Sequence, residues 1–195
     1  MMKKELRSYF LDQRNTIPAE IREELSALIC NNIVSSTEWK EYSSIMLYIP
    51  FKSEVNIRPL IELAWREDKK VFLPKIDIQL NVIVPVEYNR LSKLIKGPYG
   101  IMEPQPADNY HSEPIEFRAL CLVPLLACDT DGFRLGYGGG YYDKFFALYS
   151  NLFRCGIGFS FQKYRNDLPR EHHDIALMAF CSEEKMEYIQ KRPAY

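Results

Sequence analysis

The chain contains 195 residues, of which 47% are hydrophobic and 26% are charged, and its formal net charge at pH 7 is −1. This length and composition fit one ordinary globular domain with a substantial hydrophobic core. A nearly balanced charge provides no global basic field for nucleic acid or anionic lipid, so any phosphate-binding site has to be local. The longest apolar runs, such as Ala119 to Cys128, are far too short to span a bilayer, and the charged N-terminal segment does not resemble a signal peptide.

The first predicted element is a helix over residues 3–14, because Leu6 and Phe10 lie one turn apart on an apolar face. Lys3 and Arg7 are also one turn apart, on a different face. Such a pair of cations usually forms a solvated basic surface. The functional alternative is that Lys3 and Arg7 hold the far end of a polyphosphate.

A second helix is expected after Pro18, a residue that suits the first turn of a helix. One side of this helix should pack into the core through an apolar stripe of Ile21, Leu25, Leu28, Ile29 and Ile33. Trp39 and Tyr42 are expected in the connection that follows.

The next predicted elements form a β-α-β unit. Its first strand is Ser44 to Pro50, a short apolar run that ends in proline, and its second is Lys69 to Pro74. Between them, Asn56 is expected to cap a helix that has Pro59 in its first turn. Crossover connections of this kind join parallel strands, so the unit predicts a parallel pair.

The segment from Phe51 to Asn56 follows the first strand of this unit and contains Glu54. Ligands of open α/β sheets bind beyond the carboxyl ends of the strands, so this segment is a candidate pocket rim. A loop carboxylate in water is the simpler interpretation of Glu54 taken alone.

The segment from Gly97 to Pro106 is rich in turn residues, and it carries Tyr99, Ile101 and Met102. These side chains suit the apolar wall of a pocket, although an ordinary ordered loop has the same composition.

The remaining segments predict further strands and a last helix. The strands are expected at residues 80–86, 119–127, 154–160 and 179–182, and the terminal helix at residues 183–192. Pro85 indicates that the first of these strands lies at a sheet edge, and the strongly apolar strand at 119–127 should be central. Together the elements predict a single three-layer α/β domain over residues 1–195, with a mixed, mostly parallel sheet and helices on both faces.

The most distinctive stretch is RLGYGGGYYD, from Arg134 to Asp143, which contains four of the nine glycines of the chain. Glycine lets a ligand approach main-chain N–H groups closely, and the following YYDKFFALY has the apolar spacing of a short helix. A loop that leads into a helix N-terminus is suited to binding phosphate. Arg134 supplies a guanidinium for phosphate oxygens, and Asp143 supplies a hard carboxylate for Mg²⁺.

This glycine loop matches neither the GxxxxGK[ST] nor the GxGxxG pattern, because it lacks the lysine of the first and has Tyr141 at the last glycine of the second. A mobile surface turn therefore remains the alternative interpretation. The flanking arginine, tyrosines and aspartate favour a phosphate site.

Cysteines and histidines give little sign of metal or disulfide chemistry. The five cysteines are odd in number, scattered and mostly apolar in setting, which predicts reduced core thiols in a cytosolic protein. The three histidines lack the usual zinc spacings, although His172 and His173 lie beside Glu171 and Asp174.

Several separated motifs resemble one family. KKELR, YIPFKSEVN with LPK after its helix, GPYGIMEP, GFRLGYGGGYYDKF and LPREHHD are together similar to the 5-formyltetrahydrofolate cyclo-ligases, also called methenyltetrahydrofolate synthetases. The resemblance implies cyclisation of 5-formyltetrahydrofolate to 5,10-methenyltetrahydrofolate, with ATP as co-substrate, Mg²⁺ as cofactor, and release of ADP and phosphate. It also implies phosphorylation of the formyl oxygen, a cytoplasmic location, a monomer, small-molecule substrates, and no nucleic-acid or membrane partner.

The resemblance implies a role for each matching residue. The ATP contacts are Lys3, Lys4, Arg7, Arg134, Leu135, Gly136, Tyr137, Gly138, Gly139, Gly140, Tyr141 and Tyr142. The folate contacts are Ile49, Glu54, Tyr99, Tyr137, Gly138, Gly139, Gly140 and Tyr141, with Glu54 gripping the pterin. The Mg²⁺ ligand is Asp143, and the catalytic residues are Arg134, Arg7 and Tyr142.

The chain departs from the family pattern at three positions. Gly139 stands where some members have lysine, Tyr99 where tryptophan is common, and Met178 where many members have an acidic residue linked to Mg²⁺. A thioether is a poor ligand for so hard a cation, so we expect water or substrate phosphate in that coordination position.

Two other functions are alternatives to the enzyme. Met178 favours a catalytically weak relative that binds folate or nucleotide as a sensor or partner protein. An RNA-binding module ranks last, because the chain lacks an RNP or GXXG signature and a basic balance.

Overall fold

The computed structural model describes residues 2–105 and 117–189. Its centre is a seven-stranded sheet in the order β11-β10-β9-β6-β1-β2-β3. In chain order these strands are β1 (Ser44–Met46), β2 (Lys70–Asp77), β3 (Val82–Glu87), β6 (Leu120–Pro124), β9 (Phe153–Ile157), β10 (Ala179–Cys181) and β11 (Met186–Tyr188). Only the two outermost pairs are antiparallel, so the predicted mixed, mostly parallel sheet is confirmed.

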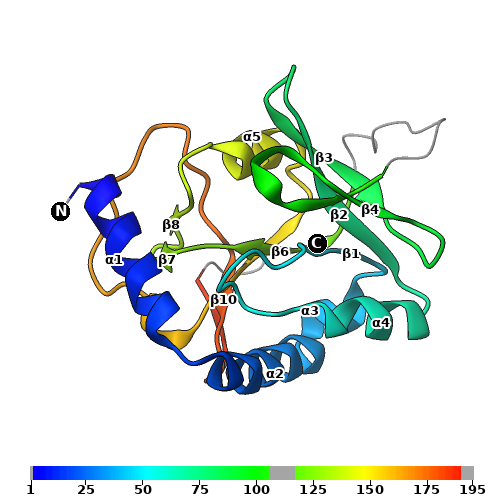
Figure 1. Cartoon of the computed structure of the whole chain (residues 1–195), viewed down its shortest axis with the longest axis horizontal. Coiled ribbons are helices and arrows are strands. Elements are labelled where there is room, and N and C mark those ends of the chain that lie inside the picture. The colour runs from blue at the N-terminus through cyan, green and yellow to red at the C-terminus, as the bar shows by residue number, and fades with distance from the viewer. Residues whose placement is uncertain (1, 106–116, 190–195) are drawn as a thin grey trace.

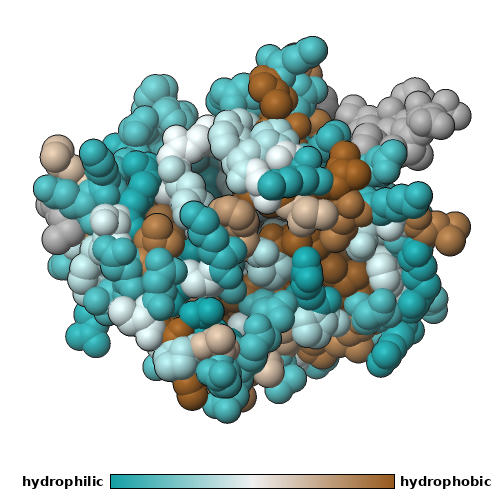
Figure 2. Space-filling view, in the orientation of Figure 1, coloured by the Kyte–Doolittle hydropathy of each residue, from teal (hydrophilic) through white to brown (hydrophobic). Residues whose placement is uncertain are grey.

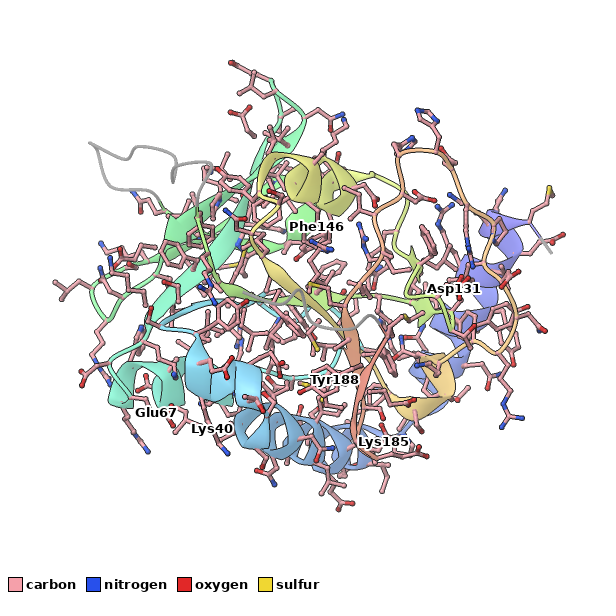
Figure 3. All side chains as sticks on the ribbon, turned by 180° about the vertical axis from the view of Figure 1, so that it is seen from behind. Lys40, Glu67, Asp131, Phe146, Lys185 and Tyr188 are labelled. Atoms are coloured by element: carbon pink, nitrogen blue, oxygen red, sulfur yellow. The ribbon has the colours of Figure 1, made fainter. Side chains whose placement is uncertain are left out.

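Helices cover both faces of this sheet, as expected for an α/β domain (Figure 1). On one face, a buried cluster joins Ile33, Trp39 and Leu60 of the helices α2 (Ala19–Ser35), α3 (Thr37–Glu41) and α4 (Pro59–Arg66) to the strands. On the other face, α5 (Tyr141–Leu148) buries Phe145 and Phe146, and Phe146 is labelled in Figure 3. The sheet is thus buried on both sides, as mostly parallel sheets usually are.

The predicted β-α-β unit is present as β1, α4 and β2, and β1 pairs in parallel with both β2 and β6. The apolar strand β6 is the fourth of the seven, as its composition predicts. The last residues of β1 and β6 point to the same edge of the sheet, because the two strands are parallel. The loops that follow them therefore approach one another.

Three local predictions differ from the structure. Ile21 and Leu28 of α2 are exposed, and the buried stripe is narrower, consisting of Ser26, Ile29, Cys30 and Ile33. At α4 the N-cap is Arg58, while the Asn56 side chain accepts a hydrogen bond from the Arg58 N–H at 3.2 Å. Trp39 lies in the short helix α3, and its side chain is buried.

The predicted terminal helix is wrong over its described part. Residues 186–188 form β11, which pairs antiparallel with β10 and closes the sheet edge. Tyr188 donates its hydroxyl hydrogen bond to the Glu38 carboxylate of α3 at 2.6 Å (Figure 3). Residues 190–192 of the prediction lie outside the described part of the chain.

Four short strands lie outside the main sheet. They form two antiparallel pairs, β4 (Leu94–Lys96) with β5 (Met102–Pro104) and β7 (Ala127–Cys128) with β8 (Arg134–Leu135). The first helix, α1 (Lys3–Thr16), packs Leu6 and Phe10 against a small cluster beside β7 and β8. In Figure 1, α1 lies on the left and β4 on the right, with α5 between them above the sheet.

Two further predictions concern the cysteines and membrane-spanning segments. All five cysteines are buried and free, as predicted. Across residues 2–105 and 117–189, none of the helices combines the length and the apolar character needed to traverse a bilayer.

Candidate active site

A cavity of about 600 Å³ lies at the edge of the sheet where β1 and β6 end. Its walls come from α1, the loop after β1, the glycine loop with the start of α5, and the β4–β5 hairpin. Hydrophilic side chains gather over α1, and hydrophobic surface lies right of centre, where β2 and β4 are (Figure 2). The cavity therefore runs from a polar end to an apolar end.

Every predicted site residue except Lys4 lines this cavity. Lys4 is exposed and lies outside the cavity wall, because each helical residue is rotated by about 100° from the one before it. Lys4 therefore faces solvent, and its contact with ATP stays a prediction. Lys3 and Arg7, which share one face of α1, both reach the cavity.

Lys3 is held by two carboxylates at the polar end. Its Nζ lies 2.8 Å from Oε1 of Glu171 and 3.3 Å from Oδ2 of Asp174. Burial alone would lower the pKa of this ammonium group, but the hydrogen bonds and charges of Glu171 and Asp174 outweigh that effect and raise it. The contact brings the irregular segment after Leu168 against the start of α1.

The glycine loop wraps around Arg7. Arg7 donates from Nε to the carbonyl oxygen of Gly136 at 2.9 Å. A Cβ at Gly138 would lie 3.3 Å from the guanidinium carbon of Arg7, and Gly138 and Gly140 have φ angles of 109° and 64°. Side chains at these two positions would be strained, so the loop needs glycine there. The helix α5 begins directly afterwards at Tyr141, as predicted.

The turn before the glycine loop is fixed by the buried carboxylate of Asp129. Its Oδ1 accepts from the N–H groups of Asp131 and Phe133 at 3.1 and 2.9 Å, and its Oδ2 accepts from Leu168 N–H and Arg170. One side chain thereby holds the entrance of the loop and the segment that leads to Asp174.

Arg134 is anchored within the protein. Its Nη2 lies 2.9 Å from Oδ1 of Asp143, its Nη1 donates to the carbonyl of Ile175 at 2.8 Å, and its guanidinium lies 5.0 Å from the ring of Phe146. The side chain is only 6% exposed. Two of its donors are thus already engaged within the protein, and its contact with phosphate stays a prediction.

Asp143 and Asp174 are the carboxylates that line the cavity beside the glycine loop. Asp143 accepts a hydrogen bond from the N–H of Ile175 at 2.9 Å, so it lies next to the segment that carries Asp174. Within the described residues, no three His, Cys, Asp or Glu side chains cluster as a complete metal site. Met178 is 7% exposed, packs in the core cluster and is absent from the cavity wall.

Glu54 lines the cavity from the loop after β1, and its carboxyl interacts with Tyr137 of the glycine loop. Its Oε2 accepts from the Phe51 N–H at 2.9 Å. Burial raises the pKa of this carboxyl group, while the Phe51 hydrogen bond and the Arg14 charge offset part of the rise. The groups that act on its carboxyl are polar, namely Arg14, Tyr137 and the Phe51 N–H, and the cavity wall also includes Ile49, Ile76, Ile83, Ile101 and Met102.

Tyrosines border the cavity near the apolar end. The hydroxyls of Tyr99 and Tyr141 lie 3.0 Å apart, which joins the β4–β5 hairpin to the glycine loop. Tyr99 has φ of 60°, a strained value for a residue with a bulky side chain. Burial raises the pKa of Tyr142 well above its ordinary value, so its phenol stays neutral and can donate a hydrogen bond.

Arg14 is the main residue that sequence reasoning missed. It is 1% exposed and donates to Tyr137 of the glycine loop and to Ser53 beside Glu54. The signal was present, since positions 3, 7 and 14 fall on one face of a helix. The two basic residues nearest the N-terminus drew attention, and Arg14 was treated only as the end of the helix.

The fold and the cavity define an α/β protein with a ligand site at the carboxyl edge of a mostly parallel sheet. A family model described as the 5-formyltetrahydrofolate cyclo-ligase family matches residues 1–183. The chain belongs to this family, and it is therefore an enzyme of a ligase family.

Individual relatives agree with this assignment. A probable 5-formyltetrahydrofolate cyclo-ligase of Schizosaccharomyces pombe is 30% identical over 95% of this chain and 97% of its own. A 5-formyltetrahydrofolate cyclo-ligase of Haemophilus influenzae is 27% identical over 81% of this chain and 89% of its own. The solved structure of Aquifex aeolicus 5,10-methenyltetrahydrofolate synthetase matches with a TM-score of 0.81 and 30% identity, covering 100% of this chain and 96% of that one.

Proposed function

We propose that this protein converts 5-formyltetrahydrofolate to 5,10-methenyltetrahydrofolate in an ATP- and Mg²⁺-dependent reaction that releases ADP and phosphate. The observation that carries the proposal is the polarity of the cavity. Lys3, Arg7 and the glycine loop form a polar part of its wall, and Glu54 shares the remaining wall with apolar side chains such as Ile49, Ile76 and Ile83. A polyphosphate and a reduced pterin are the two kinds of ligand that these ends suit.

The polar end has the properties of a triphosphate site. The glycines permit close approach to backbone N–H groups, and the first N–H groups of α5 have no partner within the helix. Lys3 and Arg7 add positive charge from α1. We place the γ-phosphoryl group near Arg7, because its guanidinium lies against Gly138 in the middle of the loop.

Asp143 and Asp174 fit Mg²⁺ as two hard oxygen ligands, with nucleotide phosphates and water completing the coordination. Asp143 is now paired with Arg134 and Asp174 with Lys3, so Mg²⁺ would share or replace these partners when it binds. When bound, Mg²⁺ supplies neutralisation of phosphate charge. Asp174 thus joins Asp143 as a proposed ligand, in place of the missing acid at position 178.

The apolar end suits the pterin. The Glu54 carboxylate can accept paired N–H hydrogen bonds from the guanidine-like edge of the ring, and such charge-assisted pairs are strong. Ile49 and Tyr99 line the wall around it and provide apolar and aromatic contact. The formyl end of the folate would then face Tyr137 to Tyr141 of the glycine loop.

The chemistry mainly requires alignment. A formyl amide oxygen is a poor leaving group, so we propose that it receives the γ-phosphoryl group; nitrogen 10 then attacks the formyl carbon and phosphate departs. Phosphoryl transfer depends on positioning and charge stabilisation, which Arg7, Arg134 and the loop supply. Tyr142, as a neutral phenol, would donate a hydrogen bond rather than act as a base.

A nucleophilic cysteine is not part of this proposal. The thiols are buried, and burial raises the pKa of Cys121 and Cys128 to about 12. Free buried thiols are usual in reducing compartments, and we propose that the protein acts in the cytoplasm as a monomer on small molecules. The sensor alternative loses its main motive, because Met178 packs in the core.

The test is to incubate the purified protein with 5-formyltetrahydrofolate, ATP and Mg²⁺ and to follow methenyl absorbance and ADP together. We expect the two products to appear in equal amounts, and neither to form without ATP. Tight binding of the folate with no turnover would overturn the proposal and favour the sensor.

A further inference from the structure

Arg14 occupies an unusual position between the two ends of the cavity. Its Nε donates to Ser53 Oγ at 3.1 Å, its Nη1 donates to the Leu125 carbonyl at 3.2 Å, and its Nη2 donates to the Tyr137 hydroxyl at 2.5 Å. The three acceptors belong to the loop after β1, the loop after β6 and the glycine loop. One side chain on α1 therefore holds together three segments that border the cavity.

The buried charge of Arg14 is not balanced by an ordinary ion pair. Among the described residues, no carboxylate lies within ion-pair distance of its guanidinium, although the side chain is almost fully buried. Burying an arginine charge is costly unless it is paired and hydrogen-bonded. Its nearest functional charge is Glu54, whose carboxylate also interacts with the Tyr137 hydroxyl.

We propose that Arg14 is a positioning residue that couples the two ends of the cavity. It fixes the Tyr137 hydroxyl beside Glu54, so that ordering of the glycine loop by nucleotide and capture of a pterin by Glu54 favour each other. The inference rests on the proposed function, and it adds a mechanism by which the two substrates bind cooperatively. Cooperativity of this kind is a coupling free energy between two sites.

The electrostatics of Glu54 supply a second line of support. The groups that act on it are Arg14 from α1 and Tyr48, Tyr137 and Tyr142 from the loops and α5. Burial raises the pKa of Glu54, and Arg14 is the cation that opposes the rise. Replacing Arg14 by a neutral residue should raise that pKa further, so folate binding would be lost at a higher pH as the solution is acidified.

The experiment compares Arg14→Met, Tyr137→Phe and the double variant by isothermal titration. Affinity for formylfolate is measured with and without a non-hydrolysable ATP analogue and Mg²⁺, between pH 5 and 8. We expect the analogue to tighten formylfolate binding at least about fivefold in the wild type, which is the lower end of typical coupling. Each single variant should lose most of this gain, and the double variant should lose no more.

Arg22→Met is the matched control. Arg22 is another helical arginine that donates to a backbone carbonyl, that of Ile17, but it does not line the cavity. It should retain the wild-type coupling and the wild-type pH profile. If Arg14→Met does not fold, Tyr137→Phe carries the test, because it removes only the hydroxyl that Arg14 holds.

The outcomes separate the two proposals. Binding of both ligands with unchanged coupling in Arg14→Met or in Tyr137→Phe would overturn the role of Arg14 while leaving the proposed function intact. Additive losses in the double variant would do the same, because they would mean that Arg14 acts independently of Tyr137. A wild-type protein that binds neither ligand would overturn the proposed function, and the coupling with it.

Discussion

The two ends of the cavity handle charge in opposite ways. At the polar end two cations have carboxylate partners within the protein, since Lys3 pairs with Asp174 and Arg134 pairs with Asp143. The pKa of Glu54 is instead raised by burial, and the Arg14 charge offsets only part of that rise. Ligand binding at the polar end would therefore replace existing ion pairs by ion pairs to the ligand. At the apolar end, the ligand would supply hydrogen-bond donors to Glu54.

This difference predicts different consequences of mutation. Charged side chains that exchange a protein partner for a ligand contribute most when charge moves in the transition state, so their loss should slow turnover. A desolvated carboxylate recognises the ground state of its ligand, so its loss should weaken binding. The following variants test that division, from the largest expected effect to the smallest.

Arg134→Ala should have the largest effect, lowering kcat about 100- to 1000-fold with little change in folate affinity. The change removes a buried guanidinium and leaves Asp143 without its partner 2.9 Å away. Steady-state kinetics and titration measure the two quantities separately. Arg90→Ala is the control, since Arg90 forms an exposed ion pair with Glu62. A fall in folate affinity at constant kcat would contradict this prediction, because it would mean that Arg134 acts in folate binding and not in turnover.

Glu54→Gln should weaken formylfolate binding about 10- to 100-fold, because a hydrogen bond to a charged group is worth about 1.5–3 kcal/mol. The substitution preserves shape, and nucleotide affinity should stay near that of the wild type. Glu62→Gln on the exposed face of α4 provides the control. An unchanged dissociation constant for the folate would remove Glu54 from the pterin site.

Lys3→Met should weaken nucleotide binding about tenfold, the value expected for one charge-assisted hydrogen bond. Lys4→Met is a close control, because the two lysines are adjacent and only Lys3 lines the cavity. Titration with ADP and Mg²⁺ distinguishes them. Equal losses in the two variants would mean that general positive charge at the N-terminus, rather than the cavity wall, attracts the nucleotide.

The smallest effect concerns stability and pH. The folded-state pKa of Glu54 is raised, so the folded protein holds this proton more tightly than the unfolded chain, and the carboxyl destabilises the fold as pH rises through that pKa. Glu54→Gln should therefore unfold at a higher temperature than the wild type at pH 8 and at a similar temperature at pH 4. Thermal unfolding by circular dichroism measures both values, and a lower melting temperature at pH 8 would contradict the sign.

Features that follow from local sequence rules could be predicted, whereas features that depend on packing could not. The glycine loop, the helix α5 and the β-α-β unit follow local rules of spacing and turn chemistry, and all of them are present. The positions of Lys4 outside the cavity wall and of Arg14 between the loops could not be predicted, because they depend on which side of α1 meets the loops, which is a property of the packed molecule. Arg14 in particular finds its acceptors 39, 111 and 123 residues away in the chain.

The predicted helix at the C-terminal end was wrong for a different reason. Residues 183–192 have a composition that favours a helix, and local propensity supports that prediction. In the fold, the open edge of β10 is available for pairing, and Ala179 to Cys181 bond with residues 186–188 instead. Tertiary pairing thus overrides propensity. The burial of Met178 could not be predicted for a related reason, since only the strand β10 and its packing show that this neighbour of Ala179 faces the core.

The central claim is that one cavity holds nucleotide at the glycine loop and folate at Glu54. A crystal structure with a non-hydrolysable ATP analogue, Mg²⁺ and 5-formyltetrahydrofolate tests it most directly. The account predicts phosphates against residues 136–140 with Lys3 and Arg7, the metal beside Asp143 and Asp174, and the pterin on Glu54. A nucleotide bound elsewhere, or a pterin whose ring does not reach Glu54, would contradict it.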